Sequence, residues 1–123
     1  MENPAPYSAK ELNYLHNEIS EREFEILGYK GAEYSSDQDR LINFFQVGVM
    51  TNQTPEKVIF SYLCKHIQCI GQAIETNKYD WCWTTKEGTE GLKQRIVDVR
   101  NYAILLAGLL DAKEKLKLEE ESK

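Results

Sequence analysis

The sequence predicts an all-α fold: a compact bundle of about four helices, assembled as an oligomer through its C-terminal helix. Four segments carry apolar residues at steps of three and four, the spacing of one helical face. Residues 91–110 contain no proline and are apolar nearly all round in their second half, which is typical of a helix buried in a bundle or in a subunit interface. The 123 residues suit a single domain, with residues 1–7 and 112–123 as loose ends.

The first helix is predicted to begin after Ser8, which forms a capping-box pattern with Glu11. It should run to about Leu27, with Gly28 as its C-terminal stop. Its inner stripe consists of Leu12, Leu15, Ile19 and Ile26. Its outer face is rich in carboxylates, which include Glu18 and Glu21. Such a cluster can hold Mg²⁺, although a run of this kind is more often a solvated face.

A loop is expected over residues 29–36, because glycine and serine are frequent there. A second helix is predicted from Asp37 to Met50, with Asn43 near its start. The buried residues of this helix are expected to be Leu41, Phe44, Phe45 and Val49.

A third helix is predicted from Thr54, as N-cap, through Pro55 to about Glu75. Its expected core stripe is Ile59, Leu63, Ile67, Ile70 and Ile74. His66 lies beside this stripe, in line with Tyr62. A lone histidine there is more often a satisfied core residue than a ligand-binding one.

The connection over residues 76–89 is unusual because Tyr79, Trp81 and Trp83 alternate in it, as on one face of an extended segment. The sequence does not decide between two roles for these rings. They can pack on the bundle or on a neighbouring subunit, or they can stack on a base, which is worth about 1–3 kcal/mol per base. Thr89 is predicted to cap the fourth helix.

The fourth helix carries two stripes. The apolar stripe is Ile96, Val99, Ala103, Leu106 and Leu110, and the polar stripe is Arg95, Asp98, Asn101 and Tyr102. A charge beside so much apolar surface is costly unless it is paired. Either Asp98 pairs with Arg95 one turn away, or the polar stripe faces a ligand pocket; the sequence leaves both open.

Composition narrows the class of protein. A net charge of −5 argues against a duplex nucleic-acid partner but not against a small nucleotide. The apolar part of the fourth helix is too short to span a membrane, and the start of the chain lacks the features of a secretory signal. We therefore expect a cytoplasmic protein whose Cys64, Cys69 and Cys82 are free thiols. His16 and His66 lie too far apart to suggest a metal site from spacing alone.

The polar positions together resemble small phage-encoded helical proteins described as MazG-like or as nucleotide-modification-associated domains. The resemblance covers about residues 28–110 and rests on short motifs: Lys30, Glu33-Tyr34, Asp39-Arg40-Leu41, Asn43-Phe44, Pro55-Glu56, Tyr62, Lys65-His66, Glu90, Arg95-Ile96-Val97-Asp98 and Asn101-Tyr102. It implies an all-α bundle, commonly oligomeric, that handles nucleotides, in the host cell cytoplasm if the protein is phage-encoded.

The sequence departs from that family at its metal-binding positions. MazG-type pyrophosphohydrolases place Glu-x-x-Glu on one helix and Glu-x-x-Asp on the next, because Mg²⁺ takes several carboxylate oxygens. Here Arg95 and Asp98 stand at the second motif, and Lys65 and His66 stand where acids would be expected. A cation at these positions repels Mg²⁺ but suits a phosphate.

The leading hypothesis is therefore a nucleotide-binding protein without turnover, which sequesters a cyclic or other nucleotide signal of host defence as phage "sponge" proteins do. The expected ligand-binding residues are Lys30, Tyr34, Asn43, Lys65, His66, Trp81, Trp83, Arg95, Asp98, Asn101 and Tyr102. No cofactor is expected. One alternative is a divergent Mg²⁺-dependent pyrophosphohydrolase with Glu18, Glu21 and Asp98 as metal ligands. The other is a structural or protein-interaction bundle without a small ligand.

Overall fold

The fold is all-α, as predicted. The computed structural model describes residues 5–34 and 39–123, with side chains omitted for 29–34. Four helices follow one another along the chain: α1 (Ala9–Tyr34), α2 (Ile42–Thr51), α3 (Pro55–Thr76) and α4 (Leu92–Glu121). The described residues contain no strand, only an isolated bridge between Thr84 and Glu90 in the α3–α4 connection. No helix in the described part of the chain has the length and apolarity needed to cross a bilayer.

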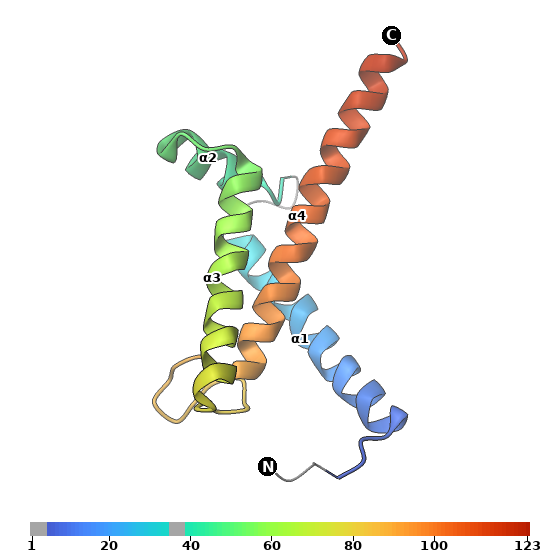
Figure 1. Ribbon diagram of the computed structural model, residues 1–123. Helices are drawn as coiled ribbons and strands as arrows, with labels where there is room; N and C mark the ends of the chain where they lie inside the picture. The colour runs from blue at the N-terminus through green and yellow to red at the C-terminus, as the bar shows by residue number, and fades with distance from the viewer. Residues whose placement is uncertain (1–4, 35–38) are drawn as a thin grey trace.

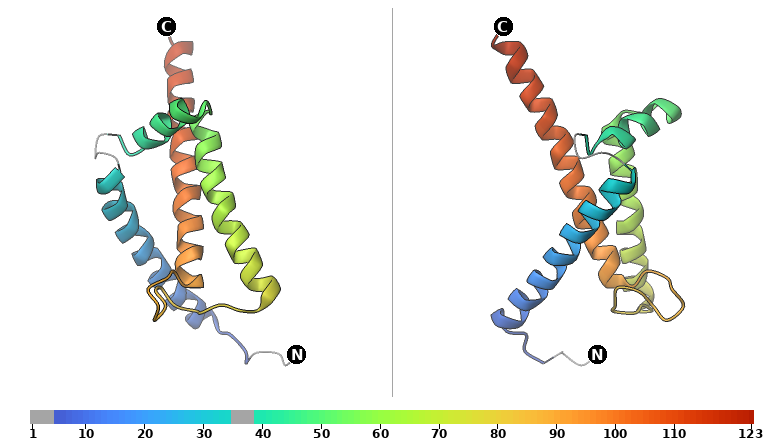
Figure 2. Two further views of the ribbon diagram at one scale, coloured as in Figure 1. Left: turned by 90° about the vertical axis from the view of Figure 1, so that its left-hand side faces the viewer. Right: turned by 180° about the vertical axis from the view of Figure 1, so that it is seen from behind.

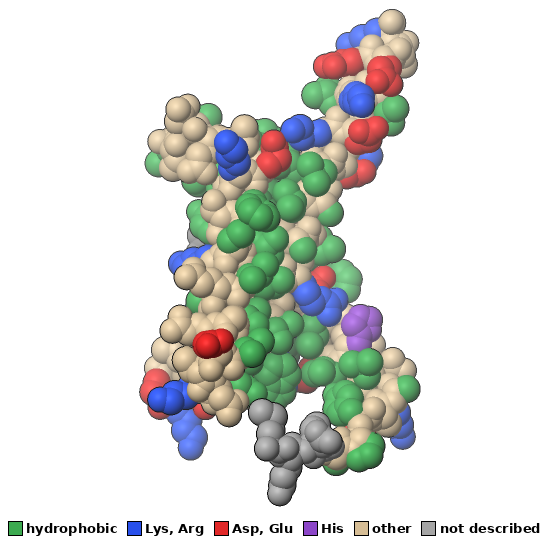
Figure 3. Space-filling model, in the orientation of Figure 1, with side chains coloured by type: hydrophobic (Ala, Val, Ile, Leu, Met, Phe, Trp, Pro, Cys, Tyr) green, Lys and Arg blue, Asp and Glu red, His purple; other side chains and the backbone are tan. Residues whose placement is uncertain are grey.

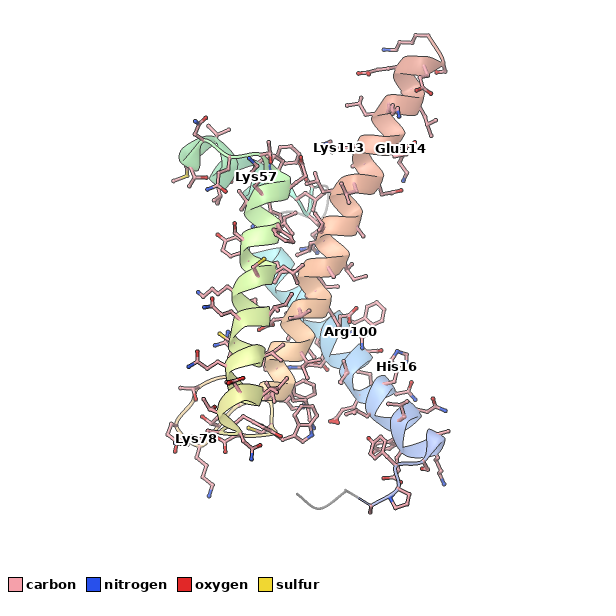
Figure 4. The ribbon with its side chains drawn as sticks, in the orientation of Figure 1. His16, Lys57, Lys78, Arg100, Lys113 and Glu114 are labelled. Atoms are coloured by element: carbon pink, nitrogen blue, oxygen red, sulfur yellow. The ribbon has the colours of Figure 1, made fainter. Side chains whose placement is uncertain are left out.

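α4 is the central element (Figure 1). α3 packs along it in the opposite chain direction, and α1 crosses it obliquely on the other side (Figure 2). α2 packs on the start of α3. The last turns of α4 project beyond the other helices, and Lys113 reaches back to Glu56 at the start of α3, at 3.1 Å (Figure 4). Among the described elements, α4 thus packs against both α1 and α3.

Two predicted helix starts are confirmed. The backbone N–H of Glu11 donates to Ser8 Oγ at 3.1 Å, and the backbone N–H of Ser8 donates to Glu11 Oε1 at 3.3 Å, which is the reciprocal bonding of a capping box. At α3, the Thr54 side chain accepts from the backbone N–H of Lys57 at 3.3 Å, and proline follows at the first helical position. Local sequence therefore determines where these helices begin.

Other predicted boundaries were wrong. α1 continues through Gly28 to Tyr34, because a glycine with open space around it weakens a helix by only about 0.5–1 kcal/mol and does not end it. α4 begins after Gly91 rather than Thr89, whose hydroxyl lies 2.6 Å from that of Thr85. Its charged tail, expected to be loose, is helical to Glu121, in keeping with its strong helix formers.

α2 begins at Ile42 rather than Asp37. Asp39 Oδ1 accepts from the backbone N–H of Leu41 at 3.0 Å, which forms a turn just before the helix. Residues 35–38 lie outside the described residues.

The core is small and divided in two. One cluster contains Phe44, Val58, Ile59 and Leu109, and the other contains Ile19, Ile26 and Val97. Many side chains predicted to be buried are exposed instead: Leu12, Phe45, Val49, Ile67, Ile74, Ala103 and Leu110. None of the described elements covers them, so within the described part of one chain these predictions of burial are wrong.

Candidate functional site

All four helices meet at a cavity of about 340 Å³. Ile26 and Leu27 of α1 lie on one side of it, α2 begins on another, and α3 and α4 supply aromatic and polar side chains. The lining residues are Ile26, Leu27, Arg40, Asn43, Phe44, Tyr62, His66, Glu90, Asp98, Asn101, Tyr102 and Leu105. Five of the predicted ligand-binding residues are therefore gathered at one place: Asn43, His66, Asp98, Asn101 and Tyr102.

Stacked rings form one wall of the cavity. Tyr102 of α4 lies between two rings of α3, with ring centroids 5.6 Å from Tyr62 and 5.3 Å from His66. The interplanar angles of these two pairs are 26° and 22°, so the rings are nearly parallel. Phe44 of α2 extends the row with a tilted contact to Tyr62 at 6.4 Å. Tyr62 and His66 are four residues apart on α3, and this spacing brings both rings against the same α4 residue.

Buried polar side chains of α4 lie beside these rings. Gln94, Asp98 and Asn101 follow one another at steps of four and three, so they share one face, and all three are buried. Gln94 donates from Nε2 to Asp98 Oδ1 at 3.0 Å and accepts from Arg22 Nε of α1 at 3.2 Å. The amide of Gln94 is thus bonded at both ends and connects α1 to Asp98.

Asn101 differs from Gln94 in its bonding. The residue is 5% exposed, yet neither its amide oxygen nor its amide nitrogen has a hydrogen-bond partner among the described residues. A buried amide without partners costs about 1–3 kcal/mol, and native structures contain few of them. Because Asn101 lines the cavity, a ligand with both a donor and an acceptor is a natural partner for this amide.

His66 connects the ring wall to the charged residues. Its Nδ1 lies 3.2 Å from Arg95 Nη1 and 3.7 Å from Asp98 Oδ2. Burial lowers the pKa of His66 below its usual value of 6.5; the Asp98 carboxylate opposes this shift, and the Arg95 guanidinium adds to it. The ring is therefore neutral at pH 7, so that Nδ1 can accept from Arg95 while Nε2 carries the proton.

The cationic residues do not all lie where they were expected. Arg95 pairs with Glu90 at 3.1 Å and with His66, and it is not among the cavity-lining side chains. Lys65 is exposed and also lies outside the lining. The cation that does line the cavity is Arg40, just before α2. Helical periodicity carries no information about Arg40, because it lies in the turn before α2.

The tryptophans lie elsewhere. Lys93 Nζ lies 5.5 Å from the Trp81 ring and 5.2 Å from the Trp83 ring, and the Arg22 guanidinium is 5.6 Å from Trp83. Trp83 also packs on the cluster of Ile19, Ile26 and Val97. Neither ring lines the cavity, so the structure does not bring them together with the other predicted ligand-binding residues. Their contacts within the chain are cation–π and packing contacts, the first of the two uses left open by the sequence.

The alternative metal ligands are not brought together. Glu18 binds Lys93 Nζ at 3.0 Å, whereas Glu21 is exposed and Asp98 belongs to the cavity. Among the side chains of residues 5–28 and 39–123, no three His, Cys, Asp or Glu form a group that could hold a metal ion. Cys64, Cys69 and Cys82 are free, as expected.

Two predicted site residues, Lys30 and Tyr34, lie outside the side chains that the structure describes. Besides four apolar side chains, three lining residues were absent from the predicted ligand-binding set: Arg40, Tyr62 and Glu90. All three stand in the motifs of the family resemblance, and Tyr62 also lies one turn before His66 on α3. Helical periodicity gives no signal for Glu90, because it lies in the irregular connection before α4.

Comparison with known proteins adds no relative: the chain matches no protein-family model, no curated protein and no solved structure. The arrangement of the cavity is therefore interpreted from its own residues.

Proposed function

We propose that this protein binds a nucleotide in the four-helix cavity and holds it without turnover. The observation that carries the proposal is the unpartnered, buried amide of Asn101 beside a row of stacked rings. A cavity of about 340 Å³ lies at the lower end of the range of small-molecule sites, about 300–1,000 Å³. It suits a ligand in the range of one nucleoside or mononucleotide unit.

Each part of a nucleotide has a counterpart in the lining. An aromatic ring of the wall offers a stacking surface for a base, worth about 1–3 kcal/mol. The Asn101 amide matches the adjacent donor and acceptor on a base edge, and Asp98 accepts from a base or ribose group. Arg40 is the cationic lining residue suited to a phosphate, with His66 as a second donor.

The biological task within this proposal is sequestration of a nucleotide signal of host defence, in the manner of phage sponge proteins. It rests on the sequence resemblance and on the basic residues Lys65, His66 and Arg95, which stand where that family would place carboxylates. A homo-oligomer belongs to the same proposal. No structural observation favours the pyrophosphohydrolase over binding alone, so hydrolysis is an outcome of the test and not a second proposal.

The test is a panel of mononucleotides, cyclic mono-, di- and trinucleotides and ADP-ribose derivatives, each added with and without Mg²⁺. A ligand at one hundred times its dissociation constant adds about 2.7 kcal/mol, which raises the melting temperature visibly. We expect a metal-independent shift, with the compound recovered intact by chromatography. The shift should be lost in Asn101→Leu and kept in Lys65→Ala, because Lys65 is exposed and outside the lining.

Three results contradict the proposal. Pyrophosphate released only with Mg²⁺ makes the protein an enzyme. A shift that survives in Asn101→Leu places the ligand outside the cavity. No shift with any compound favours the interaction bundle.

A further inference from the structure

α4 leaves exposed part of the apolar stripe that its sequence predicts to be buried. Its buried residues are the polar Gln94, Asp98 and Asn101 together with Val97 and Leu109. Of the apolar stripe, Ala103 and Leu110 are exposed and Ile96, Val99 and Leu106 are half-buried, with Leu106 packed on the core cluster of Phe44, Val58, Ile59 and Leu109. A helix of a single-chain bundle normally turns its apolar stripe inward. The exposed part of this stripe therefore needs a covering partner.

α3 extends the same apolar surface. Phe60, Ile67 and Ile74 follow at steps of seven residues, which places them along one line of the helix, and they are 56%, 50% and 69% exposed. Figure 3 shows apolar side chains running without a break over α3 and α4 on the side turned away from α1. We call this surface, formed by the α3 line and the α4 stripe, the α3–α4 face. None of its named residues is charged.

The accessible surface of the chain is large for its mass. It is 9537 Å² for 14.3 kDa, whereas a compact monomer of this mass exposes about 6,800 Å². The excess is about 2,700 Å², and a standard protein interface covers about 800 Å² on each partner. The surplus surface of one chain is therefore larger than the area that one partner contributes to a standard interface.

We propose that a second copy of this chain covers the α3–α4 face and forms a two-fold dimer. Two antiparallel helices that present a flat apolar face complete a four-helix layer when they meet the same face of a second copy. The small side chains of Ala103 and Ala107 on α4 let the facing helices approach closely. The chain carries a net charge of −5, so the uncharged face is also where two copies meet with least repulsion. This inference does not depend on nucleotide binding.

The experiment is sedimentation equilibrium of the full chain over a range of concentrations. The expected mass is twice the 14.3 kDa of the chain. Ile67→Glu places a charge in the middle of the face, and it should weaken the dimer by at least about 100-fold. Phe24→Glu is the matched control: Phe24 is equally apolar and 75% exposed, but it lies on α1, so the dimer should persist.

A second measurement does not require the variants to fold. The thermal midpoint of the wild type should rise with protein concentration if unfolding also dissociates a dimer. A monomeric mass with a concentration-independent midpoint overturns the proposal, as does a closed assembly larger than two chains. A dimer lost in Phe24→Glu but kept in Ile67→Glu would place the interface on α1.

Discussion

Replacing Asn101 by leucine is expected to stabilise the ligand-free protein and to abolish ligand binding at once. Asn101 buries an amide whose oxygen and nitrogen both lack a partner among the described residues. Removing an unsatisfied buried polar group recovers about 1–3 kcal/mol, and leucine has a similar length. At about 4 °C per kcal/mol for a chain of this size, the melting temperature should rise by about 4–12 °C.

Gln94→Leu is the matched control, with the opposite expected sign. Gln94 is as buried as Asn101 and lies on the same face of α4, but its amide bonds both Arg22 and Asp98. Leucine there leaves the buried carboxylate of Asp98 without this donor, at a cost of about 1.5–3 kcal/mol. The contrast between the two variants isolates hydrogen bonding from helix position and burial.

The assay is urea unfolding followed by far-UV circular dichroism, at one protein concentration for all variants. A fixed concentration is needed because unfolding of an oligomer depends on it. If Asn101→Leu is destabilised as much as Gln94→Leu, then the Asn101 amide is satisfied in the ligand-free protein. The argument that it awaits a ligand would then be refuted.

Three further predictions test other parts of the structure. Because burial lowers the folded-state pKa of His66, the unfolded state takes up its proton first, so stability is full above pH 6.5 and falls as the pH drops toward the folded-state pKa. His66→Gln should therefore reduce the change in the urea midpoint between pH 7 and pH 5. An unchanged pH dependence of the midpoint would exclude His66 as the source of this loss of stability. Gly91→Ala should destabilise the protein by about 1–3 kcal/mol in thermal unfolding, because the new Cβ would overlap a backbone carbonyl. Gly28→Ala should instead stabilise it by about 0.5–1 kcal/mol, because Gly28 has open space around it inside α1. Equal effects of the two variants would contradict the close approach at Gly91 and the open space at Gly28. Arg100→Ala (Figure 4) should cost about 1–3 kcal/mol in urea unfolding, because it leaves the buried Glu23 carboxylate of α1 without its ion-pair partner. The double variant Arg100→Ala with Glu23→Met should recover part of this loss. If the double variant recovers nothing, the Arg100–Glu23 ion pair does not hold α1 to α4.

The sequence predicted the existence of the four helices and two of their starts because those features depend on local chemistry. A capping box at Ser8 and a threonine–proline start at Thr54 act within a few residues of themselves. The helix ends were less predictable. Gly28 is a helix breaker only when the chain beyond it favours another conformation, and here α1 continues past it.

The site was predictable only in part, because periodicity tells which residues share a face but not which face turns inward. α4 has an apolar stripe and a polar stripe, and the tertiary structure buries the polar one. Asp98, Asn101 and Tyr102 line one cavity together with His66 from α3, as their shared face suggested. Trp81 lies apart from them, because the path of an irregular loop depends on long-range contacts such as the cation–π contact of its ring with Lys93.

The most direct test of the central claim is the side-chain amide resonance of Asn101 in ¹H–¹⁵N spectra, assigned by its absence in Asn101→Leu. Titration with the compound that gives the largest thermal shift should move this resonance together with the ring protons of Tyr62 and Tyr102. Such a result would show that the cavity is the nucleotide site. Shifts confined to the indole signals of Trp81 and Trp83, with the Asn101 amide unmoved at saturation, would contradict the account.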